Sequence, residues 1–147
     1  MTAADHNTDQ TNQNDEFYNQ LAFYTLSHGD AAFIHQHVVD AFAAWSADES
    51  TKGIKISFAL LGLYLHLERG LTGRQVQREH MRLAKHRRQW PKFDLPADRG
   101  KITPSDVLAA APGPDRDRCI DAWCASVWAA YGHVRSQVVE LFEAESH

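Results

Sequence analysis

The stretch ISFALLGLYLHL, residues 56–67, is the longest apolar run of the sequence. It belongs to a segment from about Lys55 to Arg69 that is apolar on nearly all sides when it is arranged as a helix, a pattern typical of an element enclosed by others. The run is shorter than the roughly 20 residues that a membrane span needs, and it contains His66. We therefore predict that residues 55–69 form the central helix of a soluble domain.

Helical periodicity and capping signals mark further helices on both sides of this segment. The expected helices cover residues 15–28, 31–47, 73–90, 104–111 and 115–143. Thr72 with Gln75 has the form of a capping box, and Thr103 precedes Pro104 at a helix start. No alternating, strand-like segment competes with this pattern. The sequence predicts an all-α fold, an irregular helical bundle of about five to six helices with a long C-terminal helix.

The most apolar positions of these helices are the predicted core. They are Leu60, Leu61, Leu63, Leu65, Val76, Leu83, Trp123, Val127 and Trp128. With 147 residues, 44% of them hydrophobic, the chain is long enough for one real core and too short for two comfortable ones. Residues 1–14, MTAADHNTDQTNQN, lack apolar periodicity. We expect a disordered polar tail there, followed by a single helical domain at residues 15–147.

The N-terminus and the cysteines bear on the compartment. The N-terminal segment is polar and has no hydrophobic region of the kind found in a signal peptide. Cys119 and Cys124 are the two cysteines, and their spacing matches no metal-binding or redox motif. These features predict a cytoplasmic protein with reduced thiols and no membrane association. The spacing does not assign the thiols any role.

Charge is segregated along the chain, although the net charge is only −4. The first 51 residues carry eight acidic side chains and no Lys or Arg, whereas residues 74–88 hold six Lys or Arg against one Glu. Five of these basic side chains lie within about 120° of one another on a helix, opposite the stripe that contains Val76. They are Arg74, Arg78, Arg82, Lys85 and Arg88, which we call the basic face.

The basic face is a candidate anion-binding or protein-binding surface. Its side chains suit the phosphates of a nucleic acid or of a small anion. It is equally suited to the acidic first third of the same chain or of a second copy, or to plain solvation. The overall acidity and the lack of aromatic residues in the basic face make nucleic acid an unfavoured partner.

Histidines are concentrated beside the predicted apolar stripes. The stretch HGDAAFIHQH, residues 28–37, holds three of the nine. In a helix, His35 and His37 point about 200° apart, so they cannot chelate one ion together. His37 has Asp40 three residues on as a reachable partner. His28 is expected in a last helical turn, where an imidazole interacts favourably with the helix dipole.

Inward-facing polar residues of the first four helices define a candidate pocket. Its predicted members are His28, His37, Asp40, Tyr64, His66, Glu68, His80 and Arg87. Bundles build metal and acid–base sites in this way. We expect His66 and His80 to meet, and His37, His66 and His80 to be the ligands of a divalent metal. The alternative for each residue is a hydrogen-bonded position in the core or at its rim.

No catalytic signature in the sequence is complete. HExxH, Glu-x-x-His and His-x-x-x-His are absent, as are the two common glycine-rich nucleotide-binding motifs. The blocks AFYTLSHGDAAFIHQHVVDAF, FALLGLYLHLERGLTGRQVQREHMRLA and DRCIDAWCASVWAAYG resemble a bacterial family known only as a domain of unknown function. The resemblance covers about residues 17–141. It implies a bacterial, soluble, single-domain protein, and it carries over no activity.

Two functions follow from these residues. The first is a helical protein with a histidine-lined polar pocket that serves a divalent-metal-dependent hydrolase or transferase acting on a small-molecule ligand. The alternative is a non-enzymatic helical module that binds a protein or anionic partner through the basic face. The oligomeric state is left open by the sequence.

Overall fold

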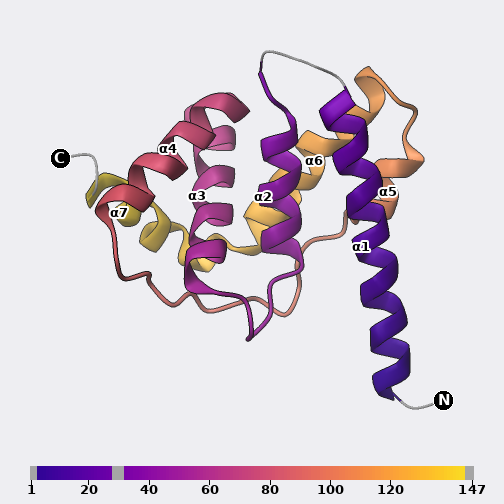
Figure 1. The fold of residues 1–147 in the computed structure, drawn as a ribbon, viewed down its shortest axis with the longest axis horizontal. Helices are drawn as coiled ribbons and strands as arrows, with labels where there is room; N and C mark the ends of the chain where they lie inside the picture. Colours follow the sequence, from indigo (N-terminus) through magenta and orange to yellow (C-terminus); the bar gives the residue numbers. More distant parts are fainter. Residues whose placement is uncertain (1–2, 28–31, 145–147) are drawn as a thin grey trace.

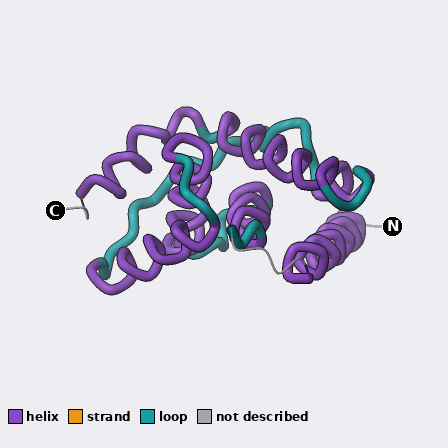
Figure 2. Tube along the Cα trace, turned by 90° about the horizontal axis from the view of Figure 1, so that it is seen from above, coloured by secondary structure: helices purple, strands orange, loops and turns teal. Residues whose placement is uncertain are grey.

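The computed structural model describes residues 3–27 and 32–144, with side chains from residue 12 onward. These residues form helices and no strand, which confirms the predicted all-α class. The helices are α1 (Ala3–Ser27), α2 (His35–Trp45), α3 (Gly53–Arg69), α4 (Gly73–His86), α5 (Pro104–Ala109), α6 (Pro114–Ala130), the 3₁₀ helix η1 (Gly132–Val134) and α7 (Arg135–Ala144). Figure 1 shows α3 between α2 and α4, and Figure 2 shows α6 and α7 along one side of the molecule.

Helix α3 is the central helix, as predicted. It packs against α2, α4, α6 and α7. Its buried residues are Ile56, Ser57, Ala59, Leu60, Leu61, Gly62, Leu63, Tyr64 and Leu65. All the residues predicted for the core are buried. Gly70 ends the helix in the left-handed conformation with φ of 70°, which a residue without a side chain adopts at little cost.

Two helices begin at residues other than those predicted. Residues 3–14 are helical where the sequence predicts a disordered tail, since no Gly or Pro stops α1 from extending toward Ala3. Helix α2 begins at His35 rather than Ala31, because Phe33 has a positive φ of 58° that interrupts helical geometry. The predicted end of the first helix at His28 lies outside the described residues. The division of the chain at residue 14 stays a prediction.

The predicted long C-terminal helix is wrong. The chain leaves α-helical geometry after Ala130, passes through η1 and resumes as α7, which has 10 residues. Tyr131, Val134, Val138 and Leu141 are all buried across this break. The apolar period therefore continues through the bend, and periodicity alone could not reveal it.

A connection without helix or strand, residues 87–103, joins α4 to α5. Helix α4 thus ends four residues before the predicted end at Trp90. Phe93 anchors the connection in the core, with 6% of its surface exposed. Arg99 Nη1 donates to the carbonyl oxygens of Ala44 and Ala47 at 3.0 and 2.9 Å, which satisfies acceptors at the end of α2.

No helix in the described part of the chain is both long enough and apolar enough to cross a membrane. Cys119 and Cys124 are both free thiols.

Candidate functional site

Polar side chains from three helices meet where α2, α3 and α6 pack together. We call His37 and Asp40 of α2, His66 of α3 and Asp121 of α6 the polar cluster. His37 and Asp40 are 5% and 2% exposed, whereas the side chains of His66 and Asp121 are 19% and 59% exposed. The polar cluster therefore runs from the core to the surface.

Two imidazole rings stack at the centre of the polar cluster. The ring centroids of His37 and His66 are 3.5 Å apart, and the rings are inclined by 16°. His66 Nε2 lies 3.0 Å from Asp121 Oδ1. A carboxylate only accepts hydrogen bonds, so this contact places a proton on Nε2 of His66. The hydrogen bond is also the main reason that the pKa of Asp121 is lowered, with the charges of His66 and His37 acting in the same direction.

Asp40 is the buried acid of the polar cluster. Gln36 Nε2 donates to Oδ1 at 3.1 Å, a partner that the sequence analysis did not identify. Among the described residues, Oδ2 has no hydrogen-bond partner. Burial raises the pKa of Asp40 well above its usual value, against the lowering effect of the bond from Gln36. The protonated form of this carboxyl is therefore favoured.

Gly62 of α3 provides the space for this carboxyl. A Cβ atom at Gly62 would lie 1.9 Å from Asp40 Oδ2 and 2.5 Å from Cγ. Any larger residue at this position would therefore collide with the acid. On α3, Gly62 lies one helical turn before His66, and on α2, Asp40 lies one turn after His37. Gly62 therefore faces Asp40 one turn away from the place where His66 faces His37.

The cysteines take no part as thiolates. Cys124, one turn after Asp121 on α6, is buried, and its thiol lies 3.6 Å from the backbone oxygen of His37. Burial raises the pKa of Cys124 well above its usual value, and it also raises that of Cys119. Nucleophilic cysteines need the opposite shift.

His80 does not belong to the polar cluster. Its Nε2 lies 2.8 Å from the backbone oxygen of Phe58, and its ring stacks on the Phe58 ring with centroids 4.6 Å apart. Burial lowers the pKa of His80 to about 4. Phe58 precedes His66 by eight residues on α3, about 12 Å along the helix axis. The structure therefore does not bring His66 and His80 together, contrary to the prediction.

The remaining predicted pocket residues serve other contacts. Glu68 accepts hydrogen bonds from Trp128 Nε1 at 2.7 Å and from Arg135 Nε at 2.9 Å, so it ties α3 to α6 and α7. Tyr64 is buried with its ring near Trp128. Arg87 follows α4 and donates from Nε to the backbone oxygen of Gln89. His28 lies outside the described residues.

The predicted metal ligands do not form a ligand set. No group of three or more His, Cys, Asp or Glu side chains within residues 12–27 and 32–144 is arranged to hold an ion. The lone pair of an imidazole nitrogen lies in the ring plane. Since His37 and His66 are nearly parallel, their lone pairs lie in separate planes 3.5 Å apart and cannot converge on one ion at about 2.0–2.1 Å. His80 faces Phe58 instead.

The basic face is only partly free. Arg74, Arg78, Lys85 and Arg88 are exposed, and Arg88 follows the end of α4 at His86. Arg82 is half-buried and pairs with Glu79 at 2.7 Å. The guanidinium of Arg74 lies 4.2 Å from the centroid of the Phe33 ring, while its side chain remains exposed.

Asp121 is the functional candidate that sequence reasoning missed. It lies next to Ile120, on the stripe that is buried in α6, and one turn before Cys124. A polar side chain beside an apolar stripe is the signal that identified His37 and His66, and Asp121 has the same position on its helix. That signal was present in CIDAWC, residues 119–124.

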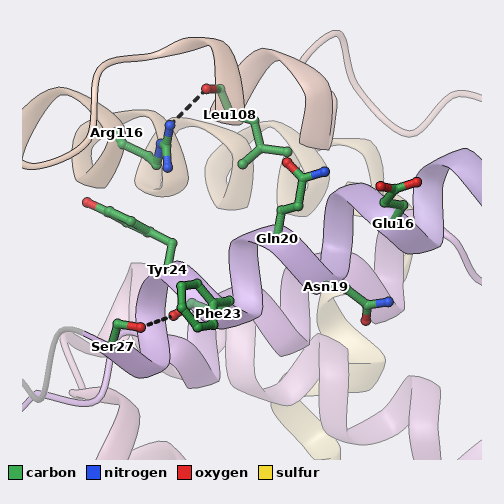
Figure 3. A pocket seen from close by; sticks show the side chains of 8 residues that line it. All are labelled: Glu16, Asn19, Gln20, Phe23, Tyr24, Ser27, Leu108 and Arg116. Carbon is green, nitrogen blue, oxygen red and sulfur yellow. Dashed lines mark hydrogen bonds between the residues drawn. The ribbon is translucent and has the colours of Figure 1, made fainter.

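Two surface hollows lie away from the polar cluster. One, of about 750 Å³, is shown in Figure 3 and is lined by residues of α1, α5 and α6. The other, of about 1110 Å³, lies between residues 47–56 and the connection at residues 90–99. Neither is lined by a member of the polar cluster.

The comparisons with known proteins identify a family. The model of a family of unknown function, DUF5946, matches residues 8–132, a range that contains every member of the polar cluster. No curated protein and no solved structure matches the chain. The resemblance to a family without assigned function is thereby confirmed. The chain belongs to the family of unknown function DUF5946.

Proposed function

We propose that the protein is an acid–base enzyme in which His66 transfers protons and Asp121 holds its ring. The observation that carries the proposal is the distance of 3.0 Å between His66 Nε2 and Asp121 Oδ1 at the open end of the polar cluster. A carboxylate that accepts a hydrogen bond from Nε2–H selects the tautomer with the proton on Nε2. In this tautomer Nδ1 is free of a proton and can accept one. Imidazole is a general base whose ordinary pKa is close to neutral pH.

The other two members support the same role for His66. The His37 ring stacked on His66 restrains its orientation, and restraint of the base is worth a large part of a catalytic effect. The ionised Asp121 stabilises the imidazolium that forms when His66 accepts a proton. Burial raises the pKa of Asp40 and so opposes a second negative charge within the polar cluster.

The reaction class is hydrolysis or group transfer on a small polar substrate. In either reaction His66 takes the proton from an attacking water or hydroxyl group and returns it to the leaving group. The proposal does not use the three-histidine ligand set predicted from the sequence, because the parallel rings of His37 and His66 cannot share an ion.

An activated ester, p-nitrophenyl acetate, is the probe for this role. We expect His66→Gln to reduce the rate of hydrolysis at pH 7.5 by about tenfold or more, since one general base contributes roughly 10²-fold. Asp121→Asn retains the hydrogen-bonding shape and removes the charge, so it should reduce the rate by less. His133→Gln is the matched control, because His133 is 41% exposed and bonds to Asp94 on another surface.

Measurements of fold and tautomer complete the test. Far-UV circular dichroism should be the same for all four proteins. Nitrogen chemical shifts of His66 should report the Nε2–H tautomer in the wild type and a mixture in Asp121→Asn. An unchanged hydrolysis rate in a folded His66→Gln protein would overturn the proposal and leave the pair as a link between α3 and α6.

A further inference from the structure

Two helices carry faces whose side chains are exposed in the described part of the chain. The α1 face consists of Asn12, Glu16, Asn19, Phe23 and Leu26, and the α4 face consists of Arg74, Arg78, Met81 and Lys85; all are exposed. Their three- and four-residue spacing puts each set on one stripe. Phe23 and Leu26 are 76% and 58% exposed and lie together on α1, and exposed apolar side chains that gather in this way mark interaction surfaces. On α4, Met81 is 59% exposed among cationic side chains.

The two faces are opposite in charge. Glu16 lies on the α1 face, with the exposed Asp15 beside it, and the chain has no Lys or Arg before Lys52. The α4 face carries three cationic side chains. The acid on α4, Glu79, pairs with Arg82, which lies beside the face rather than on it.

These faces cannot meet within one molecule. Figure 1 shows α1 and α4 on opposite sides, with α2 and α3 between them. Helix α1 packs against α2 and α5, and α4 packs against α2 and α3. The acidic and basic helices therefore complement each other only between two molecules.

The hollow of about 750 Å³ adjoins the α1 face and could accommodate an apolar side chain of a second molecule. Glu16, Asn19 and Phe23 line it together with Leu108 of α5 and Arg116 of α6. Figure 3 shows Arg116 bonded to the backbone oxygen of Leu108, at 2.9 Å, so this cation is directed to α5 rather than to Glu16. An unbranched methionine is suited to fill such an irregular hollow.

We propose that the α4 face of one molecule docks on the α1 face of a second copy, with Met81 against Phe23 and the hollow beside it. Glu16 precedes Phe23 by seven residues, and Arg74 precedes Met81 by the same number. Seven residues make about two helical turns, a distance of about 10.5 Å along the helix axis. In two parallel helices, Arg74 therefore reaches Glu16 when Met81 contacts Phe23. The contact joins two different faces, so a pair of molecules still has one unoccupied α1 face and one unoccupied α4 face. Further copies can therefore add head to tail.

The test uses one broken face at a time. Phe23→Asp disables the α1 face, and Met81→Asp with Lys85→Glu disables the α4 face; all three positions are exposed, so the fold is unaffected. By light scattering after gel filtration, we expect the wild type to exceed its monomer mass of 16.6 kDa as concentration rises, and less so at high salt. Each variant alone should be a monomer, and an equimolar mixture should form a 1:1 dimer through the remaining intact faces.

A charge reversal outside both faces serves as the matched control. Arg118→Glu reverses an exposed charge on α6, outside both faces, and should associate like the wild type. A wild type that stays monomeric at every concentration would overturn the proposal, as would a mixture that stays monomeric. Association that neither variant reduces would assign it to another surface. Salt-sensitive binding of wild-type protein to duplex DNA without self-association would reassign the α4 face to nucleic acid.

This proposal stands apart from the acid–base function. Neither face contains a member of the polar cluster, so the variants of the two experiments do not overlap.

Discussion

Replacing Gly62 by alanine measures how tightly α3 is built around the Asp40 carboxyl. In the middle of a helix, Gly→Ala ordinarily stabilises by about 1 kcal/mol. Here the new Cβ would lie 1.9 Å from Oδ2, and Asp40 is 2% exposed and bonded to Gln36, so the carboxyl cannot swing into solvent. Overpacking of a core costs about 1–3 kcal/mol, and loss of the bond from Gln36 adds roughly 1 kcal/mol. We expect a net loss of about 2 kcal/mol in the free energy of unfolding.

The same substitution should have the opposite sign when the carboxyl is removed. In an Asp40→Ala background the methyl group of Gly62→Ala enters the vacated space, so the helix-propensity gain of up to about 1 kcal/mol remains. Urea unfolding followed by circular dichroism at one fixed pH measures all four members of the cycle. Gly132→Ala is the matched control, because a Cβ there meets nothing within 4 Å. Stabilisation by Gly62→Ala in the wild type would refute the close packing of Asp40 on α3.

Three further predictions concern stability. Burial depresses the pKa of His80 from 6.5 to about 4, so its contribution is present above pH 6.5 and is lost, by roughly 3 kcal/mol, as the pH falls toward 4; His80→Gln should show a correspondingly flatter pH dependence in urea unfolding. Glu68→Gln should cost about 1 kcal/mol at pH 7, because it weakens the bond to Arg135. Because the pKa of Glu68 is lowered, this cost is present above the usual glutamate pKa and is lost as the pH falls through the lowered pKa, and an equal cost in strong acid would contradict the assignment. Deleting residues 1–14 should lower the melting temperature by only a few degrees, since Figure 1 shows this end of α1 extending past the other helices; a large drop would show that it packs.

The sequence by itself determined the local structure, because the signals act over a few residues. The capping box predicted at Thr72 and the helix start predicted at Thr103 and Pro104 are both present, since each depends on residues at most three positions apart. The apolar composition of residues 55–69 likewise identified the central helix α3. The bend between α6 and α7 escaped prediction because the apolar residues keep their period through it.

Only the tertiary structure decided which polar side chains meet. A stripe beside His37, His66 or His80 shows that the side chain faces inward, yet it does not say which helix lies opposite or how far that helix is rotated. The packing of α6 brings Asp121 to His66 across 55 residues, and the packing of α4 directs His80 to a backbone oxygen. A rotation of one residue is about 100° of helix, enough to exchange one partner for another. The membership of the polar cluster therefore depends on helix crossing and rotation, which are set by the whole core.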